Sequence, residues 1–322
     1  STAVEGDAFF IKSTNLDQYT SIEVAADVKQ SGEVLVPFRR FNSIIANLEG
    51  ETVELESDVS KTQIRAGRFK ASVEGVDVAD WPQCSMEPNQ VYSIEANQLS
   101  NAIQSVIGCA SVDESRYILN GVFIQCVDSV VSIVATDGRQ LAVHSFEADW
   151  RDFDLVIPTL AADAMIEACK GADTVEICFG GDGVGVATNC TKVWSKVIAG
   201  KFPNWRQVMP DESAMKKFPA PHKKLLGILR RVGLIADPRI GCVRLDGSAD
   251  GIAVSASNAG ESASEKLECE SPEFSVSVNH DFLAKMLATI DGESVDIKVG
   301  EDESPVLIEA SSLKYIIMPM RK

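Results

Sequence analysis

Residues 155–179 read LVIPTLAADAMIEACKGADTVEICF: an extended apolar run, a break, a helix-like segment, a glycine and an alternating strand. The same order recurs in VLVPFRRFNSIIANLEGETVELES (residues 34–57) and in VSVNHDFLAKMLATIDGESVDIKV (residues 276–299). The closing glycines are equally spaced, because 171−50 and 292−171 are both 121: Gly50, Gly171 and Gly292. A unit that recurs at a fixed interval marks repeated domains. The sequence therefore predicts three copies of one α+β unit.

Each segment contains a stretch whose apolar residues recur at the spacing of an amphipathic helix. In the first and third segments these residues form one stripe: Phe38, Phe41, Ile44, Ile45 and Leu48, and then Phe282, Leu283, Met286, Leu287 and Ile290. Asn279 precedes the third helix and is a suitable N-cap. Pro37 and Pro158 fit the first turn of the other two helices, where a missing N–H is harmless.

Each repeat also has a first half. Residues 93–108 read as a strand followed by a helix, residues 120–138 as a hairpin, and residues 222–234 as the matching helix of the third repeat. The full unit is helix, strands, helix, strands, and it predicts domains at 1–90, 91–211 and 212–322. The first repeat is shorter, because the counterpart of Tyr92 would fall at 92−121 = −29. An opening strand and helix are expected to be missing from it, and truncation and a divergent start both stay open as explanations.

Composition is that of an ordinary globular protein of two or three domains, with 322 residues, 45% hydrophobic and 24% charged. No apolar run approaches the ~18 residues of a membrane span, and the opening STAVEGDAFFIKS lacks the order of a signal peptide. We therefore expect a cytoplasmic protein. The eight cysteines form no CxxC pair, which predicts reduced core thiols. The three histidines are scattered, so no metal or cofactor site is expected.

The net charge of −17 would usually argue against nucleic acid, since phosphate binding depends on lysine and arginine. One segment, residues 215–231, nevertheless contains six basic residues and no acidic one: Lys216, Lys217, Lys223, Lys224, Arg230 and Arg231. Lys223 and Arg230 are seven residues apart, as are Lys224 and Arg231, so each pair lies on one face of a helix.

Four motifs in order carry a family resemblance: RYILNG (116–121), VATDGRQLAVHS (134–145), IAGKFPNWRQVMP (198–210) and YIIMPMRK (315–322). Together they resemble the bacterial DNA polymerase III β sliding clamp family, which shows a similar RYYLNG, TDGHRLA, GRFPDYRRVLP and MPMRL. The likeness runs in order along nearly the whole chain, on a matching three-domain spacing.

The resemblance implies the DNA clamp fold, in which each domain places two helices against antiparallel sheets, and a head-to-tail homodimer that closes a ring around duplex DNA. It implies a non-catalytic processivity factor at the nucleoid in the cytoplasm, with no membrane contact. Its partners would be the α-type subunit of the replicative polymerase, the clamp loader and other clamp-motif peptides. A ring that holds DNA by topology needs only weak phosphate contacts, which agrees with the acidic total.

By the same resemblance, positions can be assigned to DNA and to the dimer interface. Candidate DNA-binding residues are Arg39, Arg40, Arg116, Tyr117, Lys223, Lys224, Arg230 and Arg231. Candidate interface residues are Phe69, Leu234 and Ile235. The alternatives for the first set are solvated charges or a helix that complements surrounding acidic groups, and for the second set burial within their own domain. Arg116 could equally support a partner site, since it lies three residues before Leu119.

The family's partner-peptide pocket lies between domains two and three. Its wall here would be Leu119, Thr136, Gly138, Arg139, Leu141, Pro203, Gln207, Val208, Ile316, Met318, Pro319, Met320 and Arg321. Methionines suit several partner peptides because they adapt to different shapes. The chain departs from the family at Arg139-Gln140 (for His-Arg), Gln207 (for Arg) and Lys322 (for Leu), which predicts a changed rim. Alternatively, TDG (136–138) is only a β-turn, and MPMRK (318–322) is only the last β-strand and its tail.

Other function classes find less support. The sequence contains no Ser/His/Asp order, GxSxG, HExxH, P-loop or strand-linked GxGxxG. GGDGVG (180–185) lies between two strand patterns and so predicts a hairpin turn and not a phosphate loop. A diverged clamp-fold scaffold that binds peptides without encircling DNA is the remaining alternative.

Overall fold

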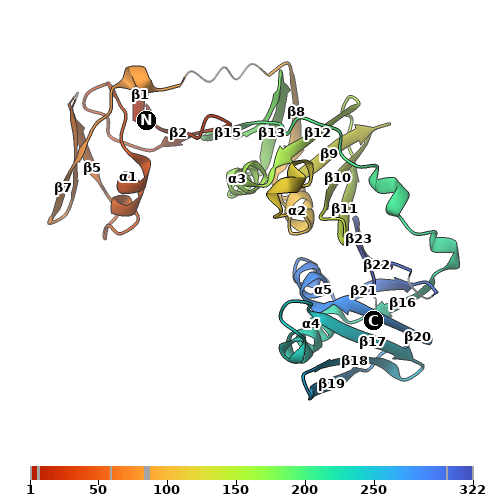
Figure 1. Cartoon of the computed structure of the whole chain (residues 1–322). Helices are drawn as coiled ribbons and strands as arrows, with labels where there is room; N and C mark the ends of the chain where they lie inside the picture. The colour runs from red at the N-terminus through yellow and green to blue at the C-terminus, as the bar shows by residue number, and fades with distance from the viewer. Residues whose placement is uncertain (1, 6–7, 59, 83–87, 302–303, 321–322) are drawn as a thin grey trace. The chain divides into compact units, whose positions relative to one another are not determined.

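The repeated helices form where the apolar spacing places them. The computed structural model (Figure 1) describes residues 2–5, 8–58, 60–82, 88–301 and 304–320. Its helices are α1 (Phe38–Ile45), α2 (Ala96–Ile107), α3 (Thr159–Cys169), α4 (His222–Val232) and α5 (His280–Leu287). Short 3-10 turns are η1 (Val78–Asp80), η2 (Glu114–Leu119), η3 (Trp205–Val208), η4 (Glu212–Ala214) and η5 (Gly233–Ile235).

The glycines that follow the repeated helices explain why the repeat is visible in the sequence. Gly50, Gly171 and Gly292 all have positive φ angles, of 118°, 76° and 115°. Residues with a side chain avoid this conformation, so glycine recurs there. Asn279 caps α5 as predicted, since its Oδ1 accepts from the N–H groups of Asp281 and Phe282 at 2.9 and 3.2 Å.

The two prolines differ from the prediction by one position. Pro37 is the N-cap of α1, and Pro158 is the last residue of the strand before α3, so neither lies inside the first turn. The predicted apolar stripe of α1 is only partly covered by the described residues, because Phe38 is 67% exposed and Phe41, Ile44, Ile45 and Leu48 are half-buried. In α5, by contrast, Leu283, Met286 and Leu287 are buried.

The chain divides into two compact units. Unit one comprises Ser1–Asn97 and Glu167–Lys196, and unit two comprises Gln98–Ile166 and Val197–Lys322. Unit one contains an eight-stranded antiparallel sheet in the order β4 (Glu33–Val34), β1 (Thr2–Glu5), β2 (Ala8–Thr14), β3 (Gln18–Val24), β15 (Thr191–Lys196), β14 (Gly183–Ala187), β13 (Thr174–Gly180) and β8 (Gln90–Glu95). Its second sheet has the order β5 (Glu54–Ser57), β6 (Lys61–Ala66) and β7 (Phe69–Glu74).

Unit two repeats this plan. Its eight-stranded sheet has the order β12 (Phe153–Pro158), β9 (Gly121–Val127), β10 (Val130–Thr136), β11 (Gln140–Glu147), β23 (Leu313–Ile317), β22 (Val306–Ala310), β21 (Val295–Val299) and β16 (Lys216–Ala220). Its four-stranded sheet has the order β19 (Glu261–Leu267), β18 (Gly251–Asn258), β17 (Cys242–Ser248) and β20 (Phe274–Asn279).

Each long sheet joins strands from two repeats at one antiparallel pairing. In unit one β3 pairs with β15, with Tyr19 opposite Trp194, and we name this pairing the first junction. In unit two β11 pairs with β23, with Leu141 opposite Ile316, and this is the second junction. The first residues of the corresponding strands are one repeat apart, since 140−18 and 313−191 are both 122. The repeat therefore builds the same junction twice.

Several smaller predictions can be checked against the described residues. GGDGVG is a hairpin turn, because Gly180 of β13 pairs with Gly183 of β14. Four cysteines are free and buried, namely Cys109, Cys126, Cys169 and Cys178, whereas Cys190 is exposed. Cys84 lies outside the described residues.

In the part of the chain that the structure describes, no helix is long and apolar enough to span a membrane. Within the same residues, no group of three or more His, Cys, Asp or Glu side chains is arranged to hold a metal ion.

Candidate functional site

The loop between β10 and β11 is a turn built by two side chains. The Asp137 carboxylate accepts from the N–H groups of Arg139 and Gln140 at 2.7 and 2.9 Å. Thr136 Oγ1 accepts from the Gly138 N–H at 3.0 Å and donates to the Gln140 carbonyl at 2.6 Å. Gly138 has a φ of +86°, which glycine adopts without strain. This turn is therefore preformed and presents Arg139 at the surface.

The end of β23 lies beside this turn. Since β11 and β23 pair, the Met318 N–H donates to the Arg139 carbonyl at 2.9 Å. The Met320 N–H donates to the Ser277 carbonyl at 2.8 Å. Met318 is 43% exposed, so an adaptable apolar side chain faces solvent next to the turn.

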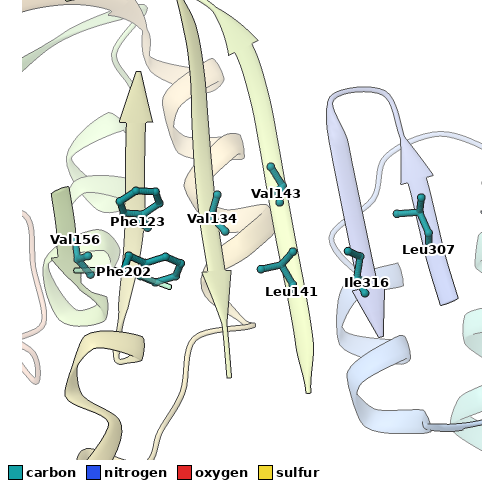
Figure 2. Close-up of a cluster of buried hydrophobic side chains, with 8 residues drawn as sticks. All are labelled: Phe123, Val134, Leu141, Val143, Val156, Phe202, Leu307 and Ile316. Atoms are coloured by element: carbon teal, nitrogen blue, oxygen red, sulfur yellow. The ribbon is translucent and has the colours of Figure 1, made fainter. Parts of the chain in front are cut away.

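An apolar cluster lies under these elements (Figure 2). Figure 2 shows side chains that β9, β10, β11, β12, β22 and β23 contribute, together with Phe202 from the segment that follows β15. The buried members are Phe123, Val134, Leu141, Val143, Val156, Phe202, Leu307 and Ile316. Partly buried residues packed against them are Ile118, Leu119, Ile198, Trp205, Met209 and Met215. We name this set the junction cluster.

The structure thus brings together part of the predicted pocket. Leu119, Leu141 and Ile316 belong to the junction cluster, while Thr136, Gly138 and Arg139 form the turn and Met318 is bonded to it. Pro203, Gln207 and Val208 flank the cluster residues Phe202 and Trp205 in sequence and are exposed. Pro319 and Met320 continue from Met318 and are half-buried. Arg321 and the departure at Lys322 lie outside the described residues.

Residues that were not predicted as part of the pocket wall also lie in or beside the junction cluster. Phe202 stacks on Phe123 with ring centroids 4.7 Å apart. The Arg206 guanidinium lies 4.2 Å from the centre of the Trp205 ring and donates to Gln125 Oε1 at 2.6 Å. These contacts explain why the GKFPNWRQ motif contains aromatic residues. The aromatic residues of the motif were the signal from which Phe202 and Trp205 could have been predicted. Gln207 replaces the second arginine of the family motif, so Arg206 is the remaining arginine at this point of the chain.

A buried polar chain connects the turn to β23. Gln140 is 6% exposed and its Nε2 donates to Asp137 Oδ2 at 3.0 Å. Its Oε1 accepts from the hydroxyl of Tyr315, which is 1% exposed, at 2.5 Å. Burial, together with the nearby Cys109 and Asp137, raises the pKa of Tyr315 well above its ordinary value. The phenol therefore stays protonated and acts as a donor.

The basic segment forms the exposed face of α4. Lys223, Lys224, Arg230 and Arg231 are all exposed there. Arg231 is not free, because its guanidinium makes two hydrogen bonds with the carboxylate of Glu265 on β19. The hydrogen bond from Arg231 holds the pKa of Glu265 below its ordinary value. An open groove of about 370 Å³ lies here, lined by Lys223, Lys224, Gly227, Ile228, Arg231, Glu265, Lys266, Leu267 and Glu268.

The other candidate DNA-binding residues are in different places. Arg39 and Arg40 are exposed on α1 of unit one. In unit two, Tyr117 is 60% exposed. Arg116 donates to the Asp137 carbonyl at 3.0 Å and lies 3.7 Å from the Asp113 carboxylate. Arg116 thus supports the turn at the second junction, the alternative that its sequence position suggested.

The candidate interface residues are mostly at the surface. Phe69 opens β7, an outer strand of the three-stranded sheet in unit one, and is 43% exposed. In unit two, Leu234 is 83% exposed and Ile235 is half-buried. Burial within their own domain therefore does not account for Phe69 and Leu234.

Comparison with known proteins gives matches along nearly the whole chain. Three family models match it in order: DNA polymerase III beta subunit, N-terminal domain (residues 2–85), central domain (93–204) and C-terminal domain (206–321). A beta sliding clamp from Rickettsia bellii is 24% identical over 97% of this chain and 88% of the relative. One from Chlamydia pneumoniae is 25% identical over 98% and 88%.

Solved structures share the fold, with three clamp domains of helices and antiparallel sheets. A DNA polymerase III subunit beta from Pseudomonas aeruginosa has a TM-score of 0.89 at 23% identity, over 99% of this chain and 92% of that one. A sliding clamp from the same organism, bound to griselimycin, has a TM-score of 0.91 at 23% identity, over 100% and 90%.

Proposed function

This chain belongs to the DNA polymerase III beta subunit family, the bacterial sliding clamps, and is a processivity clamp; we propose that it encircles duplex DNA and tethers partner proteins through the second junction. The partners are the α-type subunit of the replicative polymerase, the clamp loader and other proteins with clamp-motif peptides. The clamp domains are residues 1–90, 91–211 and 212–322. The protein has no catalytic role of its own and works in the cytoplasm at the nucleoid.

The proposed partner site is the exposed side of the junction cluster. The observation that supports it is that Met318 lies next to the preformed turn. Ligand sites combine an apolar surface with a few fixed polar groups. Here the junction cluster supplies the apolar floor, Met318 an adaptable wall, and Arg139 a cation. Among the described residues no hydrogen bond or ion pair engages the Arg139 side chain. An extended apolar peptide with an acidic or polar group near Arg139 fits this set.

The proposed ring rests on two strands, one in the first repeat and one in the third. They correspond to the junction strands but form no junction within the described chain. β3 and β11 have their counterpart in β19 of the third repeat, because the first residues of these strands are spaced by 140−18 = 122 and 261−140 = 121. β23 and β15 have their counterpart in β7 of the first repeat, because the first residues of these strands are spaced by 313−191 = 122 and 191−69 = 122. β7 and β19 are outer strands of their sheets. Unpaired strand edges invite pairing with another chain.

We therefore propose that β7 of one protomer pairs with β19 of its partner, with Phe69 meeting Leu234 and Ile235. A head-to-tail contact of this kind closes into a ring when its rotation allows. DNA would be contacted weakly by Arg39, Arg40, Tyr117, Lys223, Lys224 and Arg230, with Arg116 and Arg231 already engaged by protein groups. Weak contacts to phosphates allow sliding, because they carry no sequence information.

Retention on DNA tests the ring. The protein should remain on a nicked circular duplex and leave it once the circle is linearised. Equal retention on both forms would instead favour the diverged scaffold that binds peptides without encircling DNA.

Deletion of Met318–Lys322 tests the partner site. Because one solved relative is bound to griselimycin, this compound is a suitable probe. We expect the deletion to abolish griselimycin binding while circular dichroism and thermal unfolding stay close to those of the intact chain. Unchanged affinity would refute the assignment of the partner site.

A further inference from the structure

The two sides of the second junction are joined by a closed circuit of hydrogen bonds. Asp137 holds the backbone of Arg139 and Gln140. The Gln140 side chain bridges from Asp137 Oδ2 to the Tyr315 hydroxyl. Three residues after Tyr315, the Met318 N–H returns to the Arg139 carbonyl at 2.9 Å. The circuit therefore fixes the turn that presents Arg139 relative to the strand that presents Met318.

Both polar ends of the Gln140 side chain are used inside the protein. The side chain is nearly fully buried, so it cannot offer its amide to a ligand. Tyr315 has one hydroxyl proton, and the shorter contact, 2.5 Å to Gln140, holds it, while the Phe282 carbonyl of α5 lies at 3.2 Å. A buried donor or acceptor that loses its partner is costly, which makes the circuit rigid.

The first junction provides an internal comparison, because the chain builds the same turn there. Asn15 Oδ1 accepts from the N–H groups of Asp17 and Gln18, and Thr14 Oγ1 contacts the Leu16 N–H and the Gln18 carbonyl. Leu16 has a φ of +79°, as Gly138 has a φ of +86°. The Lys196 N–H donates to the Asp17 carbonyl at 2.8 Å, as Met318 does to Arg139.

The first junction nevertheless lacks the bridge. Gln18 corresponds to Gln140, but Val193 stands where Tyr315 would be, since 140−18 and 315−193 are both 122. A valine cannot donate to an amide, and the junction is covered instead by the ion pair of Lys196 with Asp17 at 3.0 Å. The turn is therefore stable without the bridge, so the bridge at the second junction serves something other than forming the turn.

We infer that Gln140 and Tyr315 are positioning residues of the partner site: their buried bridge holds the Arg139 turn and the Met318 strand at the spacing a peptide ligand needs. This inference rests on the proposed partner site. It assigns Gln140 a role inside the protein, where the family motif has an arginine, and leaves Arg139 as the cation of the turn.

Affinity for griselimycin tests the bridge, measured in the full-length protein at a temperature where every variant is folded. Tyr315→Phe removes one hydroxyl and Gln140→Leu removes both bonds of the amide. We expect Tyr315→Phe to weaken binding about tenfold, the effect of losing one buried hydrogen bond from the ordered site, and Gln140→Leu to weaken it more, because it loses two. Gln18→Leu is the matched control at the first junction, and Ile252→Val, in the core of unit two, controls for general destabilisation. Both controls should bind as the wild type does.

A pH profile separates positioning from simple loss of packing. In Gln140→Glu the introduced carboxyl faces Asp137, with Tyr315, Cys109 and Arg116 as the other titratable or charged groups around it. Two neighbouring carboxylates repel, which raises the pKa of one of them. Once protonated, the introduced group can donate to Asp137 and accept from Tyr315 as the amide does. Affinity relative to wild type should therefore rise as the pH is lowered from about 8 to about 5.5, whereas for Gln140→Leu the ratio stays constant.

The outcomes distinguish the inference from the function on which it rests. If the deletion of Met318–Lys322 abolishes binding but Tyr315→Phe and Gln140→Leu bind as tightly as the wild type, the bridge has no positioning role. If the deletion itself leaves binding intact, the partner site and the bridge both fall. If Ile252→Val loses as much affinity as Tyr315→Phe, the effect is general destabilisation and the inference is overturned.

Discussion

Replacing Glu265 by glutamine should release Arg231 and steepen the salt dependence of DNA binding. The Arg231 guanidinium is held by the carboxylate through Nε at 2.8 Å and through NH2 at 2.5 Å. Both side chains are well exposed, so the pair stabilises the fold little. Its main effect is electrostatic, because the carboxylate neutralises a cation on the face of α4 that carries Lys223, Lys224 and Arg230.

The magnitude follows from counterion release. Each phosphate that a protein neutralises on duplex DNA adds about 0.9 to the slope of log K against log salt concentration. One new contact from Arg231 should therefore change the ratio of variant to wild-type affinity about 3.5-fold between roughly 50 and 200 mM salt, with the variant tighter at low salt. Arg231→Gln should leave the wild-type slope unchanged, because that cation is already paired.

The assay is fluorescence anisotropy of a labelled linear duplex, titrated at several salt concentrations. A linear duplex is used because ring topology does not retain the protein on it. Glu268→Gln is the matched control: it removes one negative charge from the same groove without releasing Arg231. Equal slopes for Glu265→Gln and Glu268→Gln would refute the reasoning, since the gain would then reflect net charge alone.

Three further changes have definite expectations. Phe202→Ala removes a buried ring stacked in the junction cluster and should lower the free energy of unfolding by about 3–5 kcal/mol, measured by urea denaturation, with Phe202→Leu losing less. Hydrogen bonds from Lys298 and Lys314 hold the pKa of Glu212 below its ordinary 4.5. This carboxylate therefore stabilises the fold above that pH and loses its contribution as the pH falls further, so wild type and Glu212→Gln should converge in acid; a constant difference would contradict this. Asn279→Ala removes the cap of α5 and the bond from Asn279 Nδ2 to the Ile240 carbonyl and should cost about 2 kcal/mol, whereas Asn279→Asp should keep the cap and lose only the second bond, as thermal unfolding would show.

Local features of this fold could be predicted from the sequence because their causes are local. The helix spacing, the cap at Asn279 and the glycines with positive φ each depend on residues within a few positions of one another. The threefold interval extended these local predictions to the whole chain. Even so, an amphipathic pattern indicates only that a helix has an apolar face. It does not say what covers that face, which is why the stripe on α1 was predicted and the 67% exposure of Phe38 was not.

The polar contacts at the candidate sites could not be predicted, because their partners are distant in the sequence. Gln140 and Tyr315 are 175 residues apart, and Arg231 and Glu265 are 34 apart. The segment around Arg231 contains no acidic residue, so its sequence could not identify the carboxylate that pairs with Arg231, which Glu265 of β19 supplies. Burial of Gln140 was equally hidden, because the position follows the exposed Arg139 and belongs to a polar turn.

The two junctions show how one repeated framework acquires a binding site at one place only. Their turns use the same kind of bond, from a Thr hydroxyl and an Asn or Asp side chain to the backbone, so the backbone is retained while other positions vary. At the first junction a charged pair, Lys196 and Asp17, covers the pairing. At the second, Met318 and Arg139 stand at the corresponding positions and cannot pair with each other, since one is apolar. The apolar Met318 and the cationic Arg139 are thus left for a ligand. The closed first junction therefore differs from the partner site at these two positions and in the Gln140–Tyr315 bridge beneath them.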